Sequence, residues 1–290
     1  MGIYLSALAF GIVEAAVLAI GTVGFTMQFA VADLLNLTYG GVMIAGAYMA
    51  YALNSSGVSV WVGLVLAGVG CGVLSVALNQ LVFRPFRRRG SSHITVVIVS
   101  LGLALVVEYA IQALAGADNV SYKMHQGASL GIGAFQITVV QLVIILLSVA
   151  VMGSMHALLQ YTKFGKAMRA TAANQGLARN CGIRTDRVVT LTWFITGVLC
   201  GISGTVFAIN TGSFGATSAD LFFVVILAAM ILGGPGQPYG AMVGAIIIGI
   251  ITQESAALLN PSYKDVIAFV VLVAMLAYRP KGLFGAELQS

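Results

Sequence analysis

The chain has 290 residues, of which 59% are hydrophobic and only 8% are charged. A soluble domain usually carries about 25% charged residues, so this composition excludes an ordinary soluble globular protein. Lipid must therefore cover most of the surface, and the net charge of +5 is no sign of nucleic-acid binding. The three cysteines form no CxxC pair, so we expect no disulfide scaffold and no metal site. We expect no cofactor either.

Apolar runs long enough to cross a bilayer, about 20 residues each, recur along the whole chain. The runs 34–53 and 220–259 are rich in glycine, which favours broken or re-entrant segments there. The pattern predicts an all-α integral membrane protein, a polytopic helical bundle of about eight to ten spans, with residues 1–290 forming a single domain. The runs are 4–32, 34–53, 59–83, 94–115, 137–160, 188–210, 220–233, 238–259 and 264–279.

The positions of the basic residues predict the orientation. Twelve of the 14 Lys and Arg residues lie in three segments, 84–89, 163–187 and 279–281, and only Lys123 and Lys264 lie elsewhere. Because basic residues concentrate on the cytoplasmic side, these segments and the C-terminus are predicted to be cytoplasmic. The side of the N-terminus stays open, and we expect no cleaved signal peptide.

Three polar segments lie between the apolar runs. Residues 116–136 and 211–220 fall on the non-cytoplasmic side, and the first is long enough to contact a partner or to form a short surface structure. Residues 163–187 are basic and cytoplasmic. Alanines before Asn174 favour one short helix, Asn174 to Gly176 favour a turn, and Leu177 to Cys181 favour a second helix that ends at Gly182.

The sequence contains no motif for nucleotide binding or hydrolytic catalysis. No GxxxxGK[ST], HExxH or GxSxG is present, and the three histidines are isolated, so we predict neither an ATPase nor another enzyme. The alternative function that the residues allow is an ion-coupled secondary transporter that uses carboxylates within the membrane. The candidates are Glu14, Glu108 and Glu254, for which the sequence suggests no basic partner at membrane depth. Each would either bond to a neighbouring helix or line the solute path.

Three GxxxG pairs lie inside apolar runs. This spacing places two flat patches on one helix face and permits close approach of a neighbouring backbone. Packing within the bundle and a subunit interface are both compatible with it. The pairs are Gly68 and Gly72, Gly197 and Gly201, and Gly240 and Gly244.

The segment 163–187 resembles the coupling loop of ABC importer permeases, in the variant of the LivH-type branched-chain amino acid permease family. That family has a G-x-x-x-R-A-x-A stretch followed by a G-I pair. A departure occurs at Ala173, where the family commonly has an acidic or amide residue. The residues that carry the resemblance are Gly165, Arg169, Ala170, Ala172, Asn174, Ala178, Gly182 and Ile183.

Further motifs in the same order extend the resemblance over nearly the whole chain. Asn36, Gly40 and 46–48 are similar to the family's N-x-x-x-G…G-A-Y stretch, although Thr38 and Tyr39 depart from it. The other matching stretches are 83–88, 100–103, 232–244, 263–265 and 279–285.

The resemblance implies a permease subunit that works with ABC ATPase subunits, a second related permease subunit with which it forms a heterodimer, and a soluble extracytoplasmic solute-binding protein. It implies import of a branched-chain amino acid or another small polar solute across the bacterial inner membrane, with the coupling loop docked on the ATPase. The candidate solute path follows the interrupted helices, whose glycines could equally serve only for kinks and close packing. Its residues are Asn36, Tyr39, Gly40, Tyr48, Gly233, Gly234 and Gly236.

Overall fold

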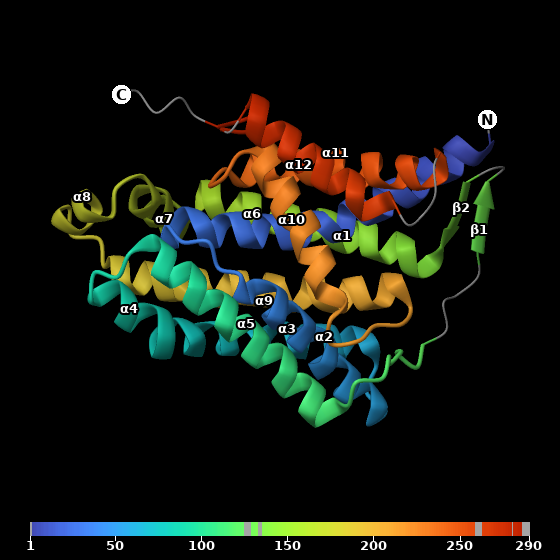
Figure 1. Cartoon of the computed structure of the whole chain (residues 1–290), viewed down its shortest axis with the longest axis horizontal. Coiled ribbons are helices and arrows are strands. Elements are labelled where there is room, and N and C mark those ends of the chain that lie inside the picture. The colour runs from blue at the N-terminus through green and yellow to red at the C-terminus, as the bar shows by residue number, and fades with distance from the viewer. Residues whose placement is uncertain (1, 125–128, 133–134, 259–262, 280, 286–290) are drawn as a thin grey trace. The chain divides into compact units, whose positions relative to one another are not determined.

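The computed structural model describes residues 2–124, 129–132, 135–258, 263–279 and 281–285. It has a helix in each of the nine apolar runs, which confirms the predicted all-α membrane fold (Figure 1). These helices are α1 (Gly2–Ala32), α2 (Thr38–Ser55), α3 (Val60–Leu78), α5 (His93–Ala115), α6 (Val139–Tyr161), α9 (Thr185–Thr211), α10 (Ser218–Gly233), α11 (Pro238–Leu258) and α12 (Lys264–Tyr278).

Six helical segments in the described part of the chain are long and apolar enough to cross a membrane. They are 7–32, 60–88, 93–115, 139–161, 185–211 and 238–258. The remaining apolar helices, α2, α10 and α12, have 18, 16 and 15 residues and do not meet the same standard of length and apolarity. The chain is thus a multi-pass membrane protein in which helices close their own backbone hydrogen bonds, as a hydrocarbon environment requires.

Short elements connect these helices. A π-helical turn, η1 (Asn79–Phe83), and α4 (Arg84–Arg88) extend α3 beyond its predicted end. The basic segment forms α7 (Lys163–Ala173) and α8 (Gln175–Asn180). The strands β1 (Ser129–Ile132) and β2 (Phe135–Thr138) pair antiparallel, beginning within the polar segment 116–136.

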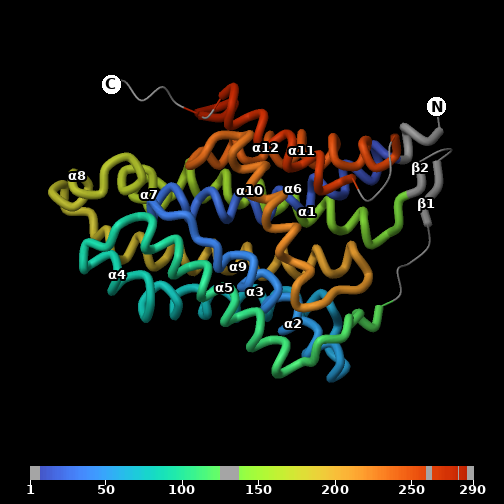
Figure 2. The backbone as a smooth tube through the Cα atoms, in the orientation of Figure 1, coloured from blue at the N-terminus to red at the C-terminus, as the bar shows by residue number. Residues whose placement is uncertain are grey.

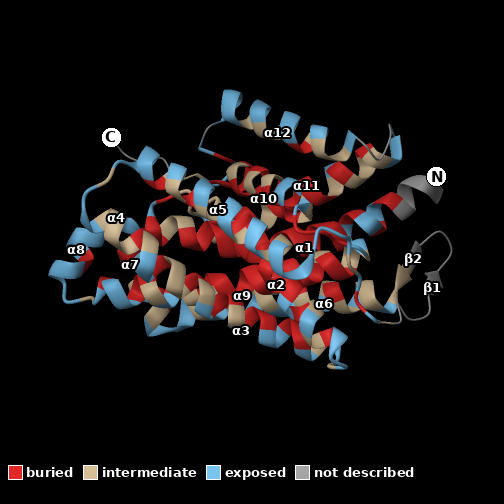
Figure 3. Ribbon diagram, turned by 60° about the horizontal axis from the view of Figure 1, so that its bottom comes forward, coloured by how far each residue is buried: buried red, intermediate tan, exposed pale blue. Residues whose placement is uncertain are grey.

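The chain divides into two compact units, and the prediction of a single permease domain over 1–290 is not tested by this division. One unit comprises residues 1–26, 124–151 and 221–290. In it, Phe25 of α1 packs edge-to-face on Phe223 of α10, and Ser148 of α6 donates a hydrogen bond to the carbonyl of Ala16. Helix α12 contacts α11 and leaves most of its other residues exposed (Figure 3).

The other unit comprises residues 27–123 and 152–220, with α2, α3 and α9 as its packed centre. Helix α2 is buried along most of its length, whereas α5 contacts α2 and exposes most of its surface (Figure 3). Such an exposed apolar helix is what a lipid environment allows.

Glycines of α3 and α9 bring these two helices into close contact. A Cβ atom on Gly197 would lie 2.5 Å from the Cβ of Ser75 and 2.7 Å from the carbonyl oxygen of Cys71. A Cβ on Gly72 would lie 2.8 Å from a methyl group of Val198. The GxxxG faces of α3 and α9 therefore meet each other, which confirms the interpretation as packing within the bundle.

The third GxxxG pair also packs within the chain. Gly240 and Gly244 of α11 face Gly233 and Ala229 of α10, with no room for a side chain between the two backbones. The glycine-rich run 220–259 is consequently a tight helix pair, α10 and α11, joined by a turn.

The two polar segments predicted to be non-cytoplasmic meet in the unit that comprises residues 27–123 and 152–220. Val120 and Phe214 form an antiparallel bridge in which each backbone N–H donates to the other's carbonyl at 2.9 Å. The Tyr122 hydroxyl donates to the carbonyl of Ala47 at 2.9 Å, and burial raises the pKa of this phenol above its ordinary value. These contacts attach the segment before β1 to the end of α9 and to α2.

Candidate functional site

The basic segment 163–187 folds as the predicted pair of short helices, and α8 follows α7 directly (Figure 2). Thr162 caps α7 by accepting a hydrogen bond from the N–H of Gly165 at 2.9 Å. Asn174 alone separates the helices, and its side chain caps α8 by accepting from the N–H of Leu177 at 2.9 Å. The turn is thus one residue long, because Asn174 begins the second helix as soon as the first one ends.

Helix α7 is amphipathic. Its buried residues Gly165, Met168 and Thr171 repeat every three positions, so one face packs against the unit, and α7 contacts α9. A Cβ on Gly165 would lie 2.7 Å from the Cα of Leu159 at the end of α6, so glycine is needed where α7 folds back on α6. Arg169 lies at the edge of this buried face; it is exposed, and its guanidinium donates to Gln160 of α6 at 3.1 Å.

Gly182 ends α8 as predicted. Its φ is +84°, and its N–H donates to the carbonyl of Arg179 at 3.0 Å, while the N–H of Ile183 donates to that of Ala178 at 3.0 Å. This left-handed residue reverses the chain toward α9. Of the other predicted coupling residues, Ala170 and Ile183 are half-buried and Ala173 is exposed.

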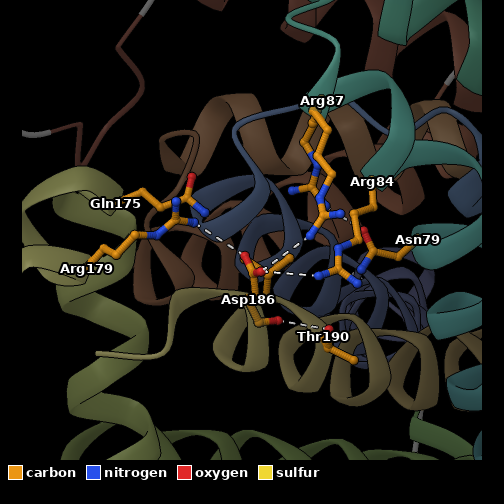
Figure 4. Close-up of a pocket in the computed structure, with 9 residues that line it drawn as sticks. Asn79, Arg84, Arg87, Gln175, Arg179, Asp186 and Thr190 are labelled. Atoms are coloured by element: carbon orange, nitrogen blue, oxygen red, sulfur yellow. Dashed lines mark hydrogen bonds and ion pairs between the residues drawn. The ribbon is translucent and has the colours of Figure 1, made fainter. Parts of the chain in front are cut away.

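Asp186, in the first turn of α9, connects three elements, a role that the sequence analysis missed. Its carboxylate lies 3.2 Å from Arg84 and 4.0 Å from Arg88, both of α4, and 3.4 Å from Arg179 of α8 (Figure 4). Exposed ion pairs each contribute only about 0–1 kcal/mol, so the contribution of this network is mainly to orientation. The available signal was that Asp186 is the only acidic residue in the segment 163–187.

A pocket of about 310 Å³ lies beside Asp186. Helices α4, α8 and α9 and the π-helical turn supply its walls (Figure 4). Its lining residues are Asn79, Arg84, Arg87, Arg88, Gln175, Arg179, Asp186, Val189 and Thr190.

The predicted path residues in the unit that comprises residues 27–123 and 152–220 lie in α2 and just before it. Asn36 is buried; its amide donates to Gln28 at 3.3 Å, and its side-chain oxygen accepts from the N–H of Thr38. Tyr39 and Gly40 are buried as well, and the carbonyl of Tyr39 accepts from the Cys200 thiol.

Tyr48 lies just past the middle of α2 in an aromatic cluster. Its ring packs edge-to-face on Phe214 at 5.3 Å and on Tyr51 at 6.4 Å between centroids. Its buried hydroxyl has no hydrogen-bond partner among the described residues. A buried hydroxyl without a partner is costly, so this position is a candidate for contact with a polar solute.

The predicted path residues in the unit that contains residues 221–290 form a turn. Gly234 and Gly236 have φ of +112° and +81°, and Gly233 contacts Gly240 so closely that no side chain fits. The C-terminal tail binds this turn: the N–H of Leu283 donates to the carbonyl of Leu232 at 2.8 Å. The kink and close packing are therefore present, while a part in the solute path stays a prediction.

One expectation about the membrane carboxylates is wrong. Lys264 of α12 donates to the Glu14 carboxylate of α1 at 2.8 Å, although no basic partner was expected. The sequence analysis counted Lys264 only as a basic residue outside the cytoplasmic segments. Glu108 is buried in α5, and Glu254 is half-buried in α11.

Comparisons with known proteins agree with the fold. Residues 7–276 match the family model described as branched-chain amino acid transport system / permease component. The chain is 27% identical to the high-affinity branched-chain amino acid transport system permease protein LivH of Escherichia coli K12, over 95% of this chain and 93% of the relative. It is 23% identical to BraD of Pseudomonas aeruginosa, over 97% and 96%.

A more distant likeness covers less of the chain. The autoinducer 2 import system permease protein LsrC of Photorhabdus laumondii is 33% identical over 43% of this chain and 40% of its own length. No solved structure gives a significant match to the chain.

Proposed function

Because the chain belongs to the branched-chain amino acid transport system permease family, we propose that it imports a branched-chain amino acid or a related small polar solute, driven by separate ATPase subunits. Family membership makes it a membrane permease component of an ABC importer. The solute and the coupling are the proposed parts.

The α7–α8 pair supports the coupling proposal. Helix α7 is anchored through Gly165, Met168 and Thr171, and Arg169 at the edge of that face is exposed. Helix α8 presents the side chain of Leu177, which is 62% exposed. An ATPase subunit would bind this outward surface, which combines a positive charge with an apolar side chain.

The Asp186 network supplies the mechanical connection. Since Asp186 pairs with arginines of both α4 and α8, a displacement of α8 would pull on the first turn of α9 and on the end of α4. ATP-driven closure of the ATPases can shift the permease between inward- and outward-facing states only if the α7–α8 contact has a different free energy in each state.

The remaining partners are proposed from what the family implies. A second related permease subunit would complete the pathway, and a soluble extracytoplasmic protein would deliver the solute and set most of the selectivity. The basic segments and the C-terminus would face the cytoplasm. Within this chain the solute would pass Tyr48, whose buried hydroxyl has no partner among the described residues.

The test compares ATPase binding and uptake in two charge reversals. Arg169→Glu reverses an exposed charge on α7, and we expect at least about a tenfold loss of co-purified ATPase and of ATP-driven leucine uptake in proteoliposomes, because the new carboxylate would face the acidic groups that complement Arg169 on the ATPase. Lys123→Glu is the matched control, an exposed basic residue on the opposite predicted side. Equal losses in both variants would contradict the coupling surface.

The same proteoliposomes separate an ATP-driven importer from an ion-coupled carrier. Uptake should persist when ion gradients are collapsed at constant ATP, and it should stop when the ATPase is omitted. Loss of uptake on collapsing the gradients would favour the carrier and would direct attention to Glu14, Glu108 and Glu254.

A further inference from the structure

The pocket beside Asp186 carries an uncompensated positive charge. Four guanidinium groups line it, those of Arg84, Arg87, Arg88 and Arg179, and Asp186 is the one carboxylate in its lining. All three ion pairs in the pocket share that carboxylate. The charges of the lining therefore leave an excess of three positive charges within one small volume.

Arg87 is the member of the set that most clearly needs a partner. Its guanidinium is half-buried and makes no ion pair among the described residues; it donates to the side-chain oxygen of buried Asn79 at 2.6 Å. That amide fixes the direction of Arg87 without neutralising its charge. A guanidinium held in this way keeps further N–H groups for an anion.

The position of the pocket relative to the bilayer limits which kinds of anion can bind in it. The arginines of α4 end the membrane-crossing segment 60–88, and Asp186 and Thr190 lie at the start of the segment 185–211. The pocket thus lies where two spanning helices leave the hydrocarbon, at the depth of lipid headgroups. Basic pockets at this depth bind phosphate-bearing headgroups.

The polar lining fits a phosphate group. Arginine forks match phosphate oxygens, and Asn79, Gln175 and Thr190 add neutral polar groups to the walls (Figure 4). The volume of about 310 Å³ is at the lower end for small-molecule sites, which span roughly 300–1,000 Å³.

We propose that this pocket binds the phosphate group of an anionic ligand, carried either by a phospholipid headgroup or by a soluble phosphate. The bound phosphate bridges the arginines of α4 to Arg179 of α8 and relieves the repulsion among them. It thereby fixes α8 against α4 and α9. The site goes beyond the proposed import function and needs neither the ATPase nor the solute to form.

The test titrates the detergent-solubilised full chain with short-chain phosphatidylglycerol and measures bound lipid by native mass spectrometry, with phosphatidylcholine of equal chain length for comparison. An arginine that directly faces an anionic headgroup contributes about fivefold in affinity for the lipid. We expect Arg87→Gln and Arg88→Gln each to lower phosphatidylglycerol binding about fivefold, and the double variant to lower it further. Arg89→Gln is the matched control, a neighbouring exposed arginine that does not line the pocket.

A second arm identifies the source of the phosphate. Inorganic phosphate and glycerol 3-phosphate are added as competitors to the lipid-bound chain. If millimolar competitor displaces the lipid and binds with the same dependence on Arg87 and Arg88, a soluble phosphate fills the site; if the lipid resists displacement, the headgroup does. The proposal is overturned if Arg89→Gln lowers binding as much as the pocket variants, or if the chain binds phosphatidylglycerol no better than phosphatidylcholine.

Discussion

Gly182 determines where α8 ends and how the chain turns into α9. Its φ of +84° belongs to the left-handed region, and its Cβ position is open, with no heavy atom within 4 Å. A side chain there would meet no steric obstacle, so any cost must come from the backbone conformation itself.

Gly182→Ala should therefore lower the free energy of unfolding by about 1–2 kcal/mol. The matched control is Gly176→Ala in α8, where the nearest atom to the new Cβ is the Asn174 side-chain oxygen at 3.4 Å. A helical glycine gains up to about 1 kcal/mol from alanine, so this control should be neutral or stabilising. Thermal unfolding of the detergent-solubilised chain measures both, and equal destabilisation would contradict a cost specific to the left-handed backbone of Gly182.

Glu14 and Asp186 show which residue-level features a sequence conceals. Glu14 pairs with Lys264, 250 positions away, and Asp186 pairs with Arg84, 102 positions away. Neither partner is indicated by local spacing, because the packing of whole helices decides which side chains meet. Gly182, by contrast, was predicted correctly, since its conformation depends on the local chain alone.

The contact between α3 and α9 is the clearest test of packing at the scale of elements. Gly197 faces Ser75 and Cys71 at distances that no real Cβ could adopt without a shift of the backbone. In membranes such close approach stabilises helix pairs through dispersion, because lipid supplies little hydrophobic drive between helices.

Gly197→Ala should accordingly cost about 1–3 kcal/mol of stability, the usual cost of overpacking. Gly102→Ala in α5 is the matched control, an exposed glycine within a spanning helix whose Cβ would have no neighbour within 4 Å. Unfolding of both variants in sodium dodecyl sulfate, followed by circular dichroism, compares them. If Gly102→Ala were as damaging, the effect would belong to the substitution and not to the helix contact.

Element types were predicted better than element ends. The run 34–53 suggested a helix from its first residues, yet α2 begins only at Thr38. Ser100 of α5 explains the delay: its hydroxyl accepts from the N–H of Leu37 at 3.1 Å, and its carbonyl accepts from the Thr38 hydroxyl at 2.8 Å. These bonds come from a distant helix, so hydropathy could not place the boundary.

The π-helical turn was missed for a related reason. The run 59–83 was expected to end at Phe83, whereas η1 and α4 continue the helix to Arg88. Buried Phe83 packs against Trp193 of α9 at 5.0 Å between ring centroids, and this contact comes from tertiary packing. Hydrophobicity marks where lipid ends, but a helix can continue into polar surroundings beyond it.

At the scale of the whole molecule, the backbone supports part of the predicted topology. The tail residues Leu283 and Phe284 donate hydrogen bonds to the carbonyls of Leu232 and Gly233 at the end of α10. The α10–α11 turn and the tail therefore lie at one face of the unit that contains residues 221–290, and α11 and α12 run away from it and back. The candidate path glycines Gly233, Gly234 and Gly236 then lie at this face.

The side that this face occupies still depends on the distribution of basic residues, and the native cysteines provide a direct test for the α7–α8 surface. Cys181 at the end of α8 is exposed, whereas Cys71 and Cys200 are buried. A membrane-impermeant maleimide should thus label the wild-type chain in inverted membrane vesicles and leave it unlabelled in intact spheroplasts, with a contrast of about tenfold or more because burial shields the other two thiols. Cys181→Ser should abolish the signal. Labelling in intact spheroplasts would place α7 and α8 outside the cell, where no ATP-driven subunit could reach them, and it would remove the coupling proposal together with the predicted orientation.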